Sequence, residues 1–94
     1  MDERRAGTVN DAATAIAGRV REVLRRNAQL STDLAKLADD ADLYEAGMSS
    51  RASVGVMLGL ETEFEIEFPD SMLRRDVFAS VSAIAAAVRS LGTA

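Results

Sequence analysis

The spacing of apolar residues predicts three main helices joined by irregular segments. In residues 10–27 the apolar side chains fall on one helical face, and Asn10 or Asp11 is suited to cap the helix start. The residues of this face are Ile16, Val20, Val23 and Leu24. We therefore expect a first helix from about Asn10 to Asn27, preceded by a flexible N-terminus of residues 1–9.

A second helix is predicted after a pair of serines. It begins at Ser49 or Ser50 and ends near Glu65, because Pro69 disfavours helical backbone at the residue before it. The residues at helical spacing are Val54, Met57, Leu58, Glu61 and Phe64, with Leu60 on an adjoining stripe. We expect this face to pack inward.

Around Pro69, the sequence predicts an extended stretch that is followed by one short helix. Ile66 and Phe68 alternate with acidic residues, and no partner strand is evident, so both are expected to be buried from an extended segment. Asp70 or Ser71 is suited to cap a short third helix. Its remaining residues are Met72, Leu73 and Arg75.

The last helix is predicted to begin near Ser80 and to end at Gly92. Its inward residues are Val81, Ile84, Val88 and Leu91. Three main helices plus one short helix indicate an all-α fold, a small antiparallel bundle.

Residues 28–49 form a long connection that is too apolar for a disordered linker. Its apolar residues are Leu30, Leu34, Leu37, Leu43 and Tyr44. We expect an ordered loop, with one helical turn near Leu34. Loops of this length in a compact domain are usually functional.

Composition narrows the chemistry available to the chain. Its 94 residues fit one domain and contain neither histidine nor cysteine, so they offer no imidazole base, thiol nucleophile, thiolate or imidazole metal ligand, or disulfide. Residues 28–70 hold ten acidic residues against Lys36 and Arg51, which disfavours nucleic acid and membrane partners and favours proteins with basic faces. No apolar run is long enough to span a membrane. We expect a cytoplasmic protein without a metal site.

The adjacent Ser49 and Ser50 allow three interpretations. A serine at a helix start is often an N-cap. A catalytic nucleophile lacks its usual histidine partner, and Lys36 is the only lysine. A covalently attached phosphate group is favoured by the unpaired N–H groups at a helix start. Both roles fit together if Ser49 caps and Ser50 is modified.

The stretch "GMSSRASVGVMLGLETEFEIEFPD" resembles the second-helix region of the acyl carrier protein family. In register, Gly47 takes the family's glycine place, Ser50 the modified serine and Val54 a core position. Further matches are Leu60, Glu61, Phe64, Ile66, Pro69 and Asp70. The resemblance implies a carrier domain in residues 10–94, with 4'-phosphopantetheine attached covalently to Ser50 by a phosphopantetheinyl transferase.

Two departures from the family pattern concern partner recognition. Ser49 replaces the usual aspartate, and Arg51 replaces a leucine that fatty-acid and polyketide enzymes contact. Gly55 and Gly59 stand inside the helix, either as packing glycines or, as we favour, as places where a partner or the arm lies close. The resemblance thus suggests a partner-binding surface made of Ser49, Arg51, Val54, Gly55 and Gly59.

The segments "ADLYEAGMSSRASV", "MLGLE" and "IEFPDSMLRRDVFAS" are similar to a bacterial subfamily of small stand-alone carriers. Its members are charged by ligases that resemble the catalytic core of seryl-tRNA synthetase. The resemblance implies a non-catalytic, monomeric carrier that holds an aminoacyl group as a thioester, with small amino acids such as glycine or alanine suggested. The alternatives are an acyl or peptidyl carrier for fatty-acid, polyketide or nonribosomal-peptide synthesis, and an unmodified helical interaction module.

Overall fold

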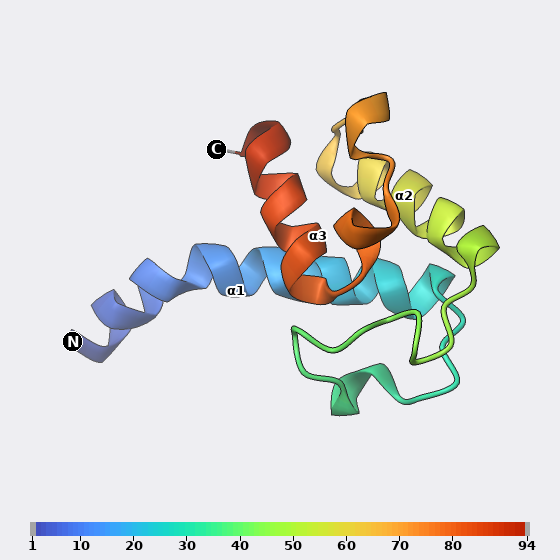
Figure 1. Ribbon diagram of the computed structural model, residues 1–94. Coiled ribbons are helices and arrows are strands. Elements are labelled where there is room, and N and C mark those ends of the chain that lie inside the picture. The colour runs from blue at the N-terminus through green and yellow to red at the C-terminus, as the bar shows by residue number, and fades with distance from the viewer. Residues whose placement is uncertain (1, 94) are drawn as a thin grey trace.

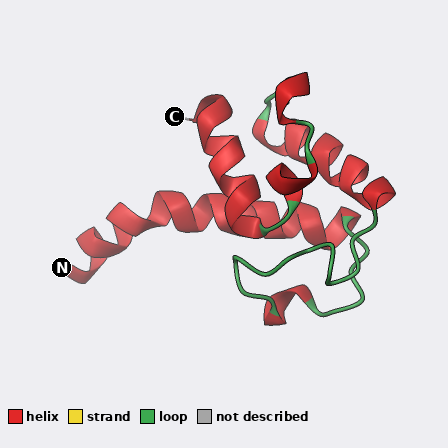
Figure 2. Ribbon diagram, in the orientation of Figure 1, coloured by secondary structure: helices red, strands yellow, loops and turns green. Residues whose placement is uncertain are grey.

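The protein is all-helical in a computed structural model, which describes the backbone of residues 2–93 and the side chains of residues 15–92. No strand occurs in this part of the chain (Figures 1 and 2). The α-helices are α1 (Asp2–Asn27), α2 (Ser50–Phe64) and α3 (Val81–Val88). The shorter helices are η1 (Leu34–Lys36), η2 (Asp70–Met72), η3 (Arg75–Phe78) and η4 (Arg89–Thr93). The predicted all-α class is confirmed.

Helix α1 begins at Asp2 rather than at Asn10, so Asn10 and Asp11 lie inside the helix and do not cap it. Residues 2–9 contain no proline, and the acidic Asp2 and Glu3 suit the positive end of a helix dipole. In Figure 1 the first half of α1 extends beyond the other helices. The flexibility of residues 1–9 stays a prediction.

The core lies where α1, α2 and α3 meet. It is mainly aliphatic and also contains three phenylalanines. Its fully buried large side chains are Val20, Leu24, Leu43, Val56, Leu60, Ile84, Val81 and Val88. Burial of these aliphatic groups is the main source of stability for a domain of this size.

The predicted inner face of α2 is partly wrong. Val56, Leu60 and Phe64 are the buried residues, whereas Val54 and Leu58 are 52% and 53% exposed. Apolar residues surround this helix on several sides, so the sequence spacing alone supports more than one face. Packing against α1 and α3 selects the face centred on Leu60.

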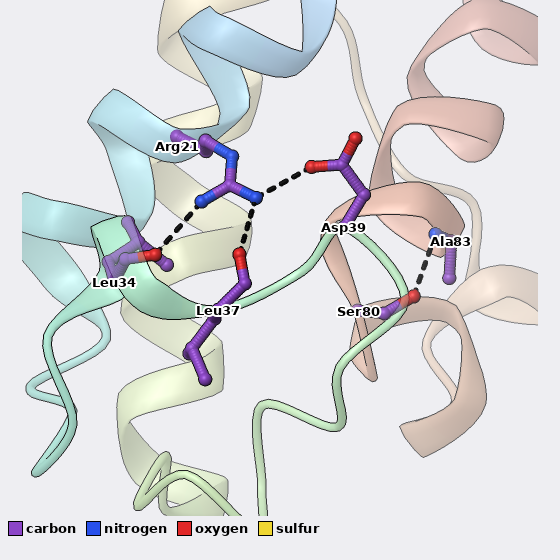
Figure 3. A network of polar contacts seen from close by, with 6 residues as sticks. All are labelled: Arg21, Leu34, Leu37, Asp39, Ser80 and Ala83. Atoms are coloured by element: carbon purple, nitrogen blue, oxygen red, sulfur yellow. Dashed lines mark hydrogen bonds and ion pairs between the residues drawn. The ribbon is translucent and has the colours of Figure 1, made fainter.

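The connection between α1 and α2 is ordered, as predicted, and contains the turn η1 at Leu34. Arg21 of α1 holds it in place (Figure 3). Its guanidinium donates to the carbonyl oxygens of Leu34 and Leu37 at 2.9 and 2.8 Å, and to the carboxylate of Asp39 at 2.6 Å. Three acceptors from one loop therefore converge on one side chain.

The same connection is bonded to the start of α3. The backbone N–H of Ser82 donates to the carbonyl of Asp39 at 2.9 Å, and that of Leu43 donates to the carbonyl of Ala79 at 2.7 Å. The Leu43 side chain is fully buried. The loop thus lies fixed between α1 and the N-terminal end of α3.

Helix α2 ends at Phe64, and Glu65 adopts a left-handed conformation with φ 55°. The extended segment that follows buries Phe68, as predicted, but leaves Ile66 only partly buried. The Phe68 backbone N–H donates to the Glu61 carboxylate at 2.9 Å. The rings of Phe68 and Phe78 meet edge to face with centroids 5.2 Å apart. These contacts fold the segment back onto the core.

The structure has two short 3-10 helices, η2 and η3, where the sequence predicted one short helix. The residue before η2 is Pro69, which makes no side-chain cap bond, so neither Asp70 nor Ser71 is a cap. Leu73 and Arg74 lie between them, and Arg74 is extended, with φ −128°. An extended residue breaks the helical ladder and divides the segment in two.

Helix α3 begins as predicted. The Ser80 hydroxyl accepts from the Ala83 backbone N–H at 3.0 Å, which caps the helix (Figure 3). The chain stays helical through η4, where Gly92 has φ 152°. In the view of Figure 1, α3 runs across α1, and the antiparallel bundle stays a prediction. No helix in residues 2–93 is both long and apolar enough to cross a membrane.

Candidate functional site

The two adjacent serines have different surroundings at the start of α2. Ser49 is extended, with φ −80° and ψ 165°, and its hydroxyl accepts from the Ala52 backbone N–H at 3.0 Å. Ser49 is therefore the N-cap, as predicted. Ser50 is the first helical residue and is exposed to solvent. Its hydroxyl makes no hydrogen bond to the residues that the structure describes, and its backbone carbonyl accepts from Ser53 Oγ at 2.6 Å.

The turn before the serine pair depends on Gly47. This residue has φ 118°, a conformation that L side chains rarely adopt. A Cβ at Gly47 would also lie 2.8 Å from the backbone nitrogen of Ser31. The next residue, Met48, is buried, and its N–H donates to the Leu43 carbonyl at 3.0 Å. A tight turn and a buried anchor thus place Ser50 at the surface.

A pocket of about 260 Å³ opens beside Ser50. Its walls come from the end of the loop, one side of α2 and the segment around η3. The lining residues are Tyr44, Ser50, Ser53, Val54, Met57, Leu73, Arg74, Arg75 and Phe78. Apolar side chains form most of the wall, and two arginines supply positive charge beside the exposed hydroxyl.

The two arginines of the pocket are held differently. Arg74 donates to both carboxylate oxygens of Asp76 at 3.1 and 2.7 Å, and this hydrogen bonding lowers the pKa of that carboxyl. The guanidinium carbon of Arg75 lies 3.9 Å from the centre of the Tyr44 ring. Stacking of this kind fixes a guanidinium while leaving its N–H edges available for anions.

Val54 is not a core residue, contrary to the expectation from the resemblance. It is 52% exposed and lies on the pocket wall, one helical turn after Ser50. Leu73, another exposed apolar residue, lines the same pocket and is 46% exposed. Arg51 is exposed as well. The predicted partner residues Ser49, Arg51 and Val54 thus share the solvent-facing start of α2.

Gly55 and Gly59 face α1 of the same chain. A Cβ on Gly59 would lie 2.9 Å from both Val23 Cγ1 and Asn27 Nδ2, and one on Gly55 would lie 3.9 Å from Asn27 Cβ. The close approach of α1 accounts for Gly59 as a packing residue, whereas a Cβ at Gly55 would make only an ordinary contact with α1. Gly59 is therefore better explained by packing than by partner binding, and the partner role of Gly55 stays a prediction.

The family model described as "Phosphopantetheine attachment site" matches residues 14–88, most of the chain. The chain belongs to this family. The members carry 4'-phosphopantetheine covalently on a serine. The resemblance to carrier proteins that the sequence indicated is therefore confirmed.

Comparison with individual proteins shows which members of this family the chain resembles. An aminoacyl carrier protein of Agrobacterium fabrum (strain C58) is 55% identical over 65 residues, which cover 69% of this chain and 78% of that protein. A carrier protein from Agrobacterium tumefaciens, crystallised with an engineered Bradyrhizobium japonicum glycine:[carrier protein] ligase and ATP, matches with a TM-score of 0.78 and 49% identity. That match covers 81% of this chain and 99% of the other.

A solution structure of a protein from Agrobacterium tumefaciens is also similar. It matches with a TM-score of 0.64 and 50% identity, over 79% of this chain and 89% of that chain. The carrier fold of the present chain thus agrees with both crystal and solution structures of related proteins.

The described residues fit a phosphopantetheine group on Ser50. Attachment requires a hydroxyl that is exposed and not already used as a cap, and Ser50 meets both conditions whereas Ser49 does not. Tyr44, Met57 and Arg75 line the same pocket as Ser50 and were not predicted from the sequence as site residues. Tyr44 stood out only as an apolar residue of the loop, and no sequence period connects it to Arg75, 31 positions further along.

Proposed function

We propose that this chain carries an aminoacyl group as a thioester on a 4'-phosphopantetheine arm attached to Ser50. The supporting observation is that the two serines differ: the Ser49 hydroxyl caps α2, while the Ser50 hydroxyl is exposed and makes no hydrogen bond to the residues that the structure describes. The likeness to an aminoacyl carrier protein, at 55% identity, supports an amino acid as the cargo.

In the attachment reaction, the chain itself supplies the Ser50 oxygen. The Ser50 oxygen bonds to the phosphorus next to the pantetheine of coenzyme A, and adenosine 3',5'-bisphosphate leaves. The sequence has no histidine, so a phosphopantetheinyl transferase supplies the base that takes the hydroxyl proton. The arm contributes the thiol that a chain without cysteine lacks, and the chain contributes position and recognition. We therefore propose a non-catalytic carrier.

The proposed charging partner is a synthetase-like amino acid:carrier protein ligase. The similar Agrobacterium carrier was crystallised with a glycine:[carrier protein] ligase, which supports this class of partner and makes glycine the first amino acid to test. We propose that the ligase contacts Ser49, Arg51 and Val54 around the arm. We further propose that the carrier is monomeric and cytoplasmic, and that a separate acceptor enzyme removes the cargo.

Intact-mass measurement tests the attachment site. After incubation with coenzyme A and a phosphopantetheinyl transferase, wild type and Ser49→Ala should gain the mass of one arm, and Ser50→Ala should gain none. Ser49→Ala should lower the free energy of unfolding by about 0.5–2 kcal/mol through its lost cap. Attachment that persists in Ser50→Ala would contradict the assignment.

Charging by the ligase tests the cargo. With ATP, glycine and a glycine:carrier protein ligase, the arm-bearing protein should gain the mass of a glycyl group, and hydroxylamine should remove it because thioesters react with this nucleophile. An arm-free protein is the control. If wild type accepts no arm at all, the chain is an interaction module instead of a carrier.

A further inference from the structure

We propose that the pocket beside Ser50 is a docking site for the first half of the arm, in which Arg75 binds the phosphate and the apolar wall receives the pantoyl group. The inference rests on the proposed attachment at Ser50. It concerns where the arm lies between transfers, which attachment alone does not decide.

Arg75 provides the positive charge that we expect to bind the phosphate of the arm. The phosphodiester that joins the arm to Ser50 keeps one negative charge, and both Ser50 and Arg75 line the pocket. Arg74 already has a bidentate carboxylate partner in Asp76. Arg75 makes no ion pair with any side chain of residues 15–92 and instead stacks on Tyr44. A stacked guanidinium is well suited to bind a phosphate through two parallel hydrogen bonds.

The exposed apolar side chains of the pocket are suited to contact the pantoyl group. The pantoyl group, which follows the phosphate in the arm, carries two methyl groups on one carbon. Val54 and Leu73 both line the pocket, and both remain about half exposed, at 52% and 46%. Covering these side chains with the pantoyl methyls would remove apolar surface from water. The arm thus offers one charged group and one apolar group to a pocket whose lining contains both an arginine and exposed apolar side chains.

The size of the pocket limits how much of the arm it holds. Its volume of about 260 Å³ is below the range of roughly 300–1,000 Å³ that is typical of pockets enclosing whole ligands. The amide-rich half of the arm and its thiol therefore remain outside. A carrier docked in this way keeps its thiol accessible to a ligase while the start of the arm is restrained.

Isotope-filtered NMR on the arm-bearing protein tests this arrangement. The chain is labelled with ¹³C and ¹⁵N, and the arm is transferred from unlabelled coenzyme A. We expect nuclear Overhauser contacts between the pantoyl methyl protons and the side chains of Val54 and Leu73. Arg75→Gln should lose these contacts, while Arg89→Gln, a matched change of an exposed arginine away from the pocket, should keep them.

Variants of Tyr44 separate the aromatic support from the charge. Tyr44→Phe keeps the ring and should retain the arm contacts, whereas Tyr44→Leu removes the surface on which Arg75 stacks and should weaken them. Circular dichroism confirms that each variant is folded. Absence of arm contacts in wild type, their survival in Arg75→Gln, or their equal loss in Arg89→Gln would each overturn the proposal. Because intact mass shows beforehand that the arm is present, these outcomes leave the attachment to Ser50 standing.

Discussion

The absence of one methyl group at Gly59 decides how closely α2 approaches α1. An added Cβ would lie 2.9 Å from Val23 Cγ1, and Val23 is only 2% exposed and so has little room to move. We expect Gly59→Ala to lower the free energy of unfolding by about 1–3 kcal/mol, as overpacking usually does. Urea denaturation followed by circular dichroism measures this change.

Gly55→Ala is the matched control on the same helix. Its Cβ would make an ordinary contact, 3.9 Å from Asn27, and alanine favours the helical backbone. We therefore expect Gly55→Ala to raise the free energy of unfolding by about 0.5–1 kcal/mol. Equal effects at the two positions would contradict the packing assignment.

Arg51 is the residue that tests partner choice. It places a fixed positive charge on the exposed start of α2. We expect Arg51→Leu to lower the rate of charging by an amino acid:carrier protein ligase at subsaturating carrier, since specificity rests on local charge as well as on apolar contact. Phosphopantetheine attachment measured by mass serves as the control, and equal charging rates would remove Arg51 from the contact surface.

At the scale of the elements, Arg21 should stabilise the long loop more than other arginines of α1 stabilise their surroundings. Arg21→Met keeps the apolar stem but leaves the carbonyls of Leu34 and Leu37 without their donor. We expect a loss of about 1–3 kcal/mol in unfolding free energy. Arg26→Met, which removes an exposed arginine paired with Glu22, is the control and should change stability little. A similar loss in both variants would contradict the anchoring role.

The element boundaries that the sequence predicted correctly depend on local chemistry. The caps at Ser49 and Ser80 follow from side chains that bond to the backbone three residues ahead. The inner face of α2 was not predicted correctly. Val54 and Leu58 are exposed at the surface, whereas Val56 and Leu60 are buried in the core. All four are apolar, and only packing against α1 and α3 distinguishes them.

In the candidate site, too, a local motif was predictable and a contact between distant residues was not. Ser50 was predictable because a motif of consecutive residues marks it. Tyr44 and Arg75 were not, since they meet only after the loop has folded against η3. Contacts between distant residues depend on the tertiary fold, which spacing in the sequence does not encode.

At the scale of the whole molecule, the uneven charge should influence how partners meet. Residues 28–70 contain ten acidic residues and two basic ones, so a ligase with a basic face is attracted before contact. Raising the salt concentration from about 0.1 to 1 M shortens the screening length from about 10 to 3 Å and should slow charging at low carrier concentration. At saturating carrier the rate should change little, because only association is affected.

Charging rates measured against carrier concentration at both salt concentrations check this expectation. A carrier that passes its cargo between enzymes needs complexes that separate quickly, with interfaces below about 1,200 Å². A complex with the ligase that survives gel filtration at high salt would contradict this view of the carrier.

The bonding of the loop to both α1 and α3 also affects how the molecule opens. The amide hydrogens of Leu43 and Ser82 are held by carbonyls across the loop–α3 contact, and Arg21 holds the other side of the same loop. Lifting the loop off α1 and α3 would expose the buried Leu43 side chain. Hydrogen exchange at Leu43 and Ser82 should therefore be as slow as in the centres of the helices, so that Ser50 stays in position while only its arm moves.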